Sequence, residues 1–174
     1  MSAKKHLPKS NSPPSNSSPP RLMLLLSFLR RSPRCIELAL QMAAERRAEL
    51  IVLFVLYDEV MAKVTKKLTE DGWIGGKPSE QFLAALRQEY REQAQTKIQE
   101  VEKAARSKGV ALRAFSREGN LVEEALALIK QEQVDLVVVT RRKRSRLSRF
   151  LFGSAVADLM LQSPCPVKVI DDEE

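Results

Sequence analysis

The pattern of apolar and polar positions along this chain switches repeatedly between two kinds of segment. Five short apolar runs are mostly continuous, which is typical of strands buried on both faces of a parallel sheet. Stretches with apolar residues at helical spacing separate these runs. The five predicted strands are Leu22–Leu26, Leu50–Leu56, Val110–Phe115, Val134–Thr140 and Val167–Ile170.

Four segments between the strands have the spacing of amphipathic helices. Ser32-Pro33, Ser79-Glu80 and Asn120 are start signals for the first three, and Gly109 is a stop signal after the second. The glycine-rich stretch from Tyr57 to Pro78 predicts an irregular excursion. The apolar stripes are Ile36, Ala39, Leu40 and Ala43; Leu83, Leu86, Tyr90, Ala94, Ile98, Val101 and Ala105; Val122, Ala125, Leu126 and Ile129; and Phe152, Val156, Leu159 and Met160.

This order of elements predicts an α/β fold with an open, five-stranded parallel sheet and helices on both faces. Right-handed crossovers favour the strand order 3-2-1-4-5. In that order the winding reverses between the first and fourth strands, and ligands bind at the carboxyl ends of such strands. Those ends are Ser27 and Thr140, so we expect a ligand crevice between them.

The positive charge of the chain is concentrated just after Thr140. The net charge is +7, and residues 141–149 alone carry six positive side chains in nine positions. Lys4, Lys5 and Lys9 add three more, so the remainder sums to −2. Gly153-Ser154 then opens the fourth helix, and backbone amides at a helix start favour anions. The sequence therefore predicts an anion site, although a solvated charge run or a helix cap remains an alternative.

Both ends of the chain have a biased composition. Residues 1–20 contain six Ser and five Pro with no acidic residue, which predicts a disordered tail before a single domain over residues 21–171. The last four residues, Asp171-Asp172-Glu173-Glu174, are acidic. They form either a solubilising end or a competitor for the basic loop within the same chain.

Composition excludes several kinds of catalytic site. The only histidine is His6 in the tail, and Cys35 and Cys165 form no disulfide or metal pattern. A Ser-His or Cys-His nucleophile is thereby excluded and no metal site is expected, so we predict that the protein is not an enzyme. Two free thiols are typical of a reducing compartment. No run is long enough to span a membrane, so we predict no membrane insertion and a cytoplasmic protein.

Several short motifs point together to one family, which the chain resembles from Leu22 to Ile170: the universal stress proteins. The resemblance implies the adenine nucleotide alpha hydrolase-like fold. It rests on Glu37-Leu38-Ala39-Leu40, Ala48-Glu49-Leu50, Arg117-Glu118-Gly119, residues 134–139, Arg144-Ser145, Leu147-Ser148-Arg149, Gly153-Ser154 and Pro164-Cys165-Pro166-Val167.

The resemblance also implies a nucleotide site with a divergent motif. Members that bind ATP carry Gly, two residues, Gly, nine residues, then Gly-Ser or Gly-Thr. Here Thr140 and Lys143 replace the first two glycines, while Gly153-Ser154 matches. The family's aspartate after the first strand falls on Ser27, and Phe28-Leu29 replace a polar turn. The predicted nucleotide or anion site is Ser27, Val55, Val139, Thr140, Arg141, Lys143, Arg144, Ser145, Gly153 and Ser154.

Two functions fit these features. The first is a non-catalytic stress-response or regulatory protein that binds a nucleotide or related anion weakly or in altered form. No cofactor follows with certainty, and ATP or another adenine nucleotide is the candidate. The second is a homodimeric interaction protein without a nucleotide, whose basic loop docks an acidic protein or nucleic acid. For either function, the resemblance implies a homodimer paired through the last strand, where Val167 and Val169 support the contact.

Overall fold

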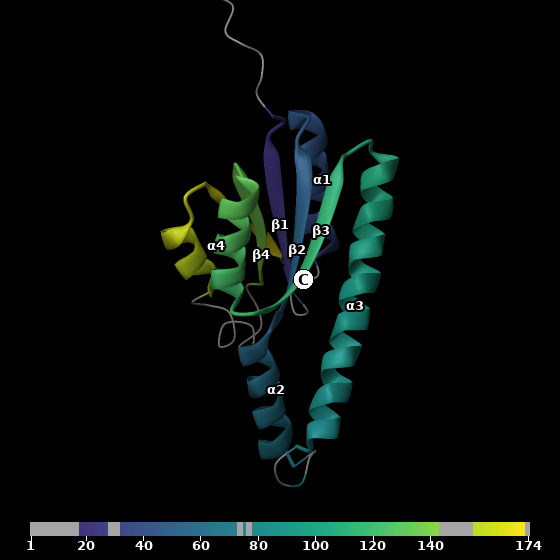
Figure 1. Ribbon diagram of the computed structural model, residues 1–174, viewed down its shortest axis with the longest axis vertical. Coiled ribbons are helices and arrows are strands. Elements are labelled where there is room, and N and C mark those ends of the chain that lie inside the picture. Colours follow the sequence, from purple (N-terminus) through teal and green to yellow (C-terminus); the bar gives the residue numbers. More distant parts are fainter. Residues whose placement is uncertain (1–17, 28–31, 73–74, 76–77, 143–154, 173–174) are drawn as a thin grey trace, which may run out of the picture.

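The computed structural model describes residues 18–27, 32–72, 75, 78–142 and 155–172. Five parallel strands form one sheet in the order β3-β2-β1-β4-β5, which confirms the predicted fold and strand order (Figure 1). The strands are β1 (Arg21–Ser27), β2 (Glu49–Tyr57), β3 (Leu112–Gly119), β4 (Leu136–Arg142) and β5 (Val167–Asp172). The helices are α1 (Pro33–Arg46), α2 (Asp58–Glu70), α3 (Glu80–Ser107) and α4 (Leu121–Glu132), and residues 155–162 are also helical.

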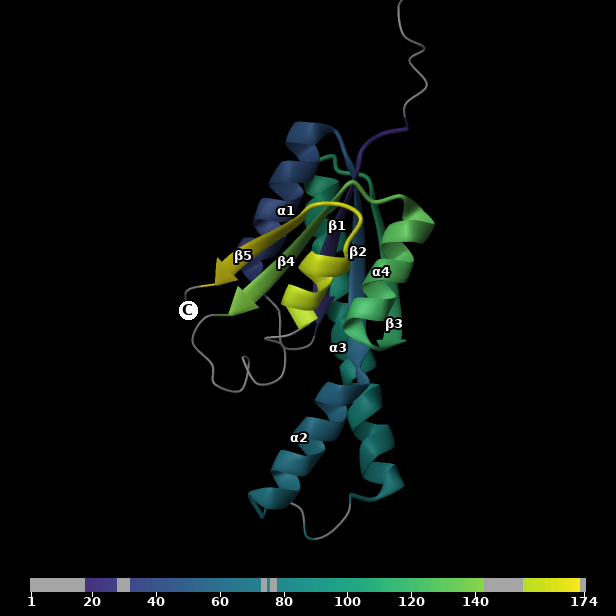
Figure 2. The same ribbon diagram turned by 90° about the vertical axis from the view of Figure 1, so that its left-hand side faces the viewer.

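Helices cover both faces of the sheet (Figure 2). The helices α1 and α3 pack on one face, and α4 with residues 155–162 packs on the other. Strand β1 contributes Leu22, Leu24 and Leu26 to the first face and Met23 and Leu25 to the second. Because both sets are buried, the sequence of this strand is continuously apolar rather than alternating.

Two strands begin two residues later than the apolar runs that predicted them. Strand β3 begins at Leu112 rather than Val110, and β4 begins at Leu136 rather than Val134. The backbone amides of Val110 and Val134 instead bond the preceding helices, to Ala105 O at 2.9 Å and Ile129 O at 3.0 Å. An apolar residue just after a helix therefore buries its side chain while it closes the helix end, and its hydrophobicity does not indicate a strand.

The predicted helix starts and the predicted stop are confirmed by their capping geometry. Ser32 Oγ accepts from the Cys35 amide at 3.1 Å, and Ser79 Oγ accepts from the Phe82 amide at 3.2 Å. Asn120 Oδ1 accepts from the Val122 amide at 2.9 Å. Gly109 follows the end of α3 with a φ of 66°, a left-handed conformation that glycine adopts without strain.

The prediction of an irregular segment after Tyr57 was wrong over residues 58–70, which form α2. Asp58 and Glu59 lie at the amino end of this helix, where negative charge is favourable, and Met61 packs against Leu56 and Tyr90. The glycines that suggested irregularity begin only at position 72. This helix and the first part of α3 extend beyond the carboxyl ends of the strands (Figure 1).

The apolar face of the last predicted helix is only partly as expected. Val156 and Leu159 are buried, but Met160 is 52% exposed, because it lies one position beyond Leu159 and turns away from the sheet. Phe152 lies outside the described residues. In α4, Leu128 is fully buried whereas the predicted Leu126 is half-buried.

Candidate functional site

The edge at which a crevice was predicted lies at the ends of β1 and β4 and carries the buried side chain of Ser27. Ser27 is the last residue of β1 and is 2% exposed. Its Oγ has no hydrogen-bond partner among the described residues. A buried hydroxyl without a partner costs free energy, so such atoms are rare in folded proteins and point to a missing partner.

Two of the predicted site residues share a sheet face with Ser27. Val55 pairs with Ser27 across β1 and β2, and Val55 and Val139 belong to the core on the α4 face. Ser27 follows Met23 and Leu25 in the alternation of β1, which gives it the same face. The structure therefore combines a polar atom with an apolar wall, as a site for a base and sugar requires.

Thr140 is buried at the same edge but alternates with Val138, whose side chain belongs to the core on the α1 face. It therefore lies across the sheet from Ser27 and Val55. Arg141 extends β4 by one more residue. The other predicted contacts lie outside the described residues: Lys143, Arg144, Ser145, Gly153 and Ser154.

Two charged residues at this edge were not predicted as part of the site. Arg117 of β3 pairs with Val55, and its guanidinium donates to Glu124 Oε2 at 3.2 Å and to Gln131 Oε1 at 2.8 Å. Asp171 of β5 pairs with Arg141 of β4. Arg117 and Asp171 each follow an apolar run in the sequence. The strand register places them at the carboxyl ends of the strands.

The opposite edge of the sheet carries a network of paired charges. The Arg113 guanidinium donates to Glu49 Oε1 at 2.7 Å, to Glu49 Oε2 at 3.1 Å and to Glu132 Oε2 at 2.7 Å. These bonds, to Glu49 first and then to Glu132, raise the pKa of Arg113 above its ordinary value. Arg21 adds an ion pair to Glu49 at 3.5 Å and a hydrogen bond to Glu132 O at 2.6 Å. The cations here already have protein partners.

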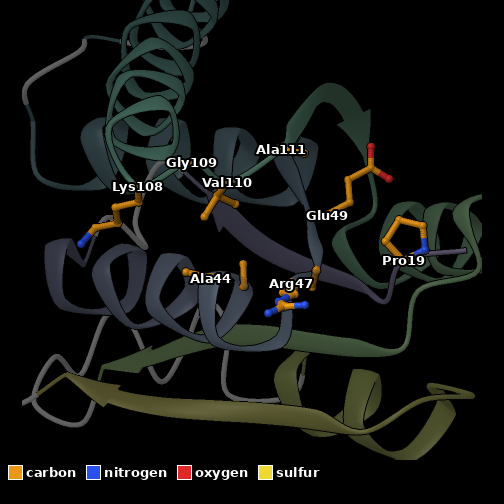
Figure 3. Close-up of a pocket in the computed structure, with 10 residues that line it drawn as sticks. Pro19, Ala44, Arg47, Glu49, Lys108, Gly109, Val110 and Ala111 are labelled. Atoms are coloured by element: carbon orange, nitrogen blue, oxygen red, sulfur yellow. The ribbon is translucent and has the colours of Figure 1, made fainter.

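A cavity of about 250 Å³ also lies at this amino edge, between the ends of α1 and α3 (Figure 3). Lys108 at its rim pairs with Glu37 at 2.8 Å, and Glu49 is held by the network above. The carboxyl ends of two helices border it, and their partial negative charge disfavours anions. This cavity is not the predicted anion site. It is lined by Pro19, Ala43, Ala44, Arg47, Ala48, Glu49, Lys108, Gly109, Val110 and Ala111.

Within the described part of the chain, no group of three or more His, Cys, Asp or Glu side chains is arranged to hold a metal ion. No helix among those residues is long and apolar enough to cross a membrane. Cys35 and Cys165 do not form a disulfide with each other.

Comparison with known proteins gives concordant matches. The chain is 27% identical over 139 residues to Universal stress protein YxiE of Bacillus subtilis (strain 168), covering 80% of this chain and 90% of the relative. The structure of universal stress protein UspA from Lactobacillus plantarum matches with a TM-score of 0.66 and 16% identity over 89% of this chain and 99% of its own. A universal stress protein in complex with cAMP matches with a TM-score of 0.56 and 17% identity over 90% and 100% of the two chains.

The structural matches have low identity and establish the fold, whereas the family rests on the sequence. The model of the universal stress protein family matches residues 21–171, which run from the first residue of β1 to Asp171 in β5. With this match the chain belongs to the universal stress protein family.

Proposed function

We propose that this protein is a non-catalytic stress-response regulator that binds an adenine nucleotide, or a related anion, in the crevice between the carboxyl ends of β1 and β4. The observation that carries the proposal is the Ser27 hydroxyl, buried at the topological switch point without a partner among the described residues. A ribose hydroxyl or phosphate oxygen would supply the missing hydrogen bond.

The surroundings of Ser27 support the choice of a nucleotide over a simple anion. Val55 and Val139 are buried on the same face, so a purine base that reached Ser27 would pack in apolar surroundings. The positive residues that follow β4 in the sequence would pair with phosphates. A relative with this fold was crystallised with cAMP, which adds weight to an adenine ligand.

Thermal-shift titration with AMP, ATP and a cyclic dinucleotide tests this proposal. A ligand at about 100 times its dissociation constant is expected to raise the unfolding midpoint by about 4 °C or more. Inorganic tripolyphosphate is the matched control because it carries charge without a base. No shift with millimolar nucleotide would contradict the proposal. An equal shift with tripolyphosphate would instead favour the interaction protein, whose basic loop docks a polyanion.

We also propose that the protein is a homodimer that pairs through β5, as the resemblance to the family implies. Strand β5 is at the edge of the sheet, with Val167 and Val169 only half-buried. In the preceding helical segment Leu161 is 84% exposed and Met160 is 52% exposed. An apolar edge of this kind is costly in water unless another chain covers it.

Sedimentation velocity tests the dimer. Val169→Lys places a charge at the edge strand and is expected to give monomers, while Gln99→Lys on the exposed face of α3 adds the same charge and leaves the dimer intact. A dimer that survives Val169→Lys would contradict pairing through β5. Since Cys35 and Cys165 do not form a disulfide with each other, a reducing, cytoplasmic location is part of the same proposal.

A further inference from the structure

The pairing of β4 with β5 continues past the apolar core into charged residues of opposite sign. The register runs from Val137 with Val167 to Thr140 with Ile170, and then joins Arg141 to Asp171 and Arg142 to Asp172. Neighbouring strands are about 4.8 Å apart. The backbone ladder thus fixes two acidic residues beside the first two cations of the basic run.

The paired charged residues of β4 and β5 also lie next to the proposed nucleotide site. Strands β1 and β4 pair up to Leu25 and Val139, so the next residues with the same alternation are Ser27 and Arg141. Asp171 is paired with Arg141 on the other side of β4. Consequently Ser27, Arg141 and Asp171 follow one another across three adjacent strands.

We propose that Asp171 is a specificity-determining residue that weakens the binding of highly charged anions at this edge of the sheet. The proposal rests on the proposed function, because it concerns the ligand charge accepted at that site. By strand alternation Asp171 shares the sheet face of Val167, Val169 and Ser27. Its negative charge offsets the attraction of the neighbouring Arg141, and the offset grows with each charge on the ligand. Nucleotides with fewer phosphates are therefore favoured relative to ATP.

The register distinguishes this role from that of a solubilising end. A flexible acidic tail would move away from a bound phosphate, so it would cost little affinity. Asp171 is part of β5 and is held by the same backbone ladder as Val167 and Val169. The ladder fixes the backbone of Asp171 at the carboxyl edge of the sheet.

Calorimetric titration of AMP, ADP and ATP into the full-length protein and into the Asp171→Asn variant tests the proposal. At low salt the variant is expected to bind AMP within about twofold of the parent and ATP about tenfold more tightly, with ADP between them. The matched control is Glu45→Gln, which makes the same change in net charge on α1. It should leave all three affinities within about twofold.

The outcomes separate this inference from the proposed function. Equal gains for AMP and ATP, or no gain, would overturn the role of Asp171 while nucleotide binding stands. Binding of ATP only by the variant would support the inference in its strongest form. No binding by either protein would overturn both. Titration at high salt provides a second test. A preference for AMP over ATP that persists at about 0.5 M salt would contradict an electrostatic origin.

Discussion

The two ends of the sheet use charge in different ways. At the amino ends of the strands, Arg113 bridges Glu49 and Glu132, and Arg21 adds a further ion pair to Glu49, so the charges there neutralise one another. At the carboxyl ends, the hydroxyl of Ser27 is buried without a partner among the described residues. The amino-end charges are paired, although Arg21 Nε lies 3.5 Å from Glu49 Oε2 and makes no hydrogen bond, whereas the Ser27 hydroxyl has neither a charged nor a hydrogen-bonding partner among the described residues.

The two ends of the sheet therefore contrast charges that stabilise the fold with a polar atom that marks a candidate binding site. Charged side chains that find partners inside the protein contribute to stability and need nothing further. A buried polar atom without a partner lowers stability, and binding sites are where such costs are retained. The cavity at the amino edge illustrates the point, because two of the charged side chains that line it, Lys108 and Glu49, form ion pairs with other residues of the protein.

The largest expected effect comes from breaking the amino-edge network. Arg113→Met leaves the Glu132 carboxylate, whose side chain is 10% exposed, without its charged partner. We expect the free energy of unfolding in urea to fall by about 2 kcal/mol, with nucleotide affinity unchanged. Arg91→Met is the matched control, because Arg91 makes a 2.7 Å bond to Glu118 on an exposed surface. This control should lower stability much less, and equal losses would contradict a special role of the Arg113–Glu132 pair.

Removing positive charge at the other edge should change binding rather than folding. Replacing Arg141, Arg142, Lys143 and Arg144 with Gln is expected to weaken ATP binding about tenfold to a hundredfold at low salt. The slope of log affinity against log salt should become shallower, as measured by titration at several salt concentrations. Unchanged affinity and slope would show that the basic run does not contact phosphate.

A smaller effect is expected at the cap of α4, which lies at the carboxyl edge but has a structural role. Asn120→Ala removes the oxygen that accepts from the amides of Val122 and Glu123. The free energy of unfolding should fall by about 1 kcal/mol without a change in nucleotide affinity. A loss of binding with unchanged stability would instead make Asn120 part of the site.

Most of the fold could be predicted from the sequence because each strand is buried on both faces. The continuous apolar runs and the caps at Ser32, Ser79 and Asn120 indicated the elements correctly. Helix α2 was missed because its apolar positions touch only a small cluster around Leu56 and Tyr90, so its stripe is short. The spacing of apolar residues predicts an element poorly where that element makes few tertiary contacts.

The site was predicted less completely than the fold, for a physical reason. The position of Ser27 follows from topology, but its unsatisfied hydroxyl depends on burial by residues distant in sequence. The pairing of Arg141 with Asp171 depends on register, which the apolar pattern sets only indirectly. Neither property is visible in a local motif.

The most direct test of the central claim compares AMP binding and stability in Ser27→Ala. If the Ser27 hydroxyl forms its hydrogen bond only with a ligand, Ser27→Ala should leave the unliganded protein as stable as the parent or slightly more stable. The reason is that the substitution removes a buried polar atom that has no partner among the described residues. AMP should then bind about fivefold more weakly by calorimetry, while Ser116→Ala, at an exposed position of β3, changes neither. Unchanged AMP affinity in Ser27→Ala would contradict the account.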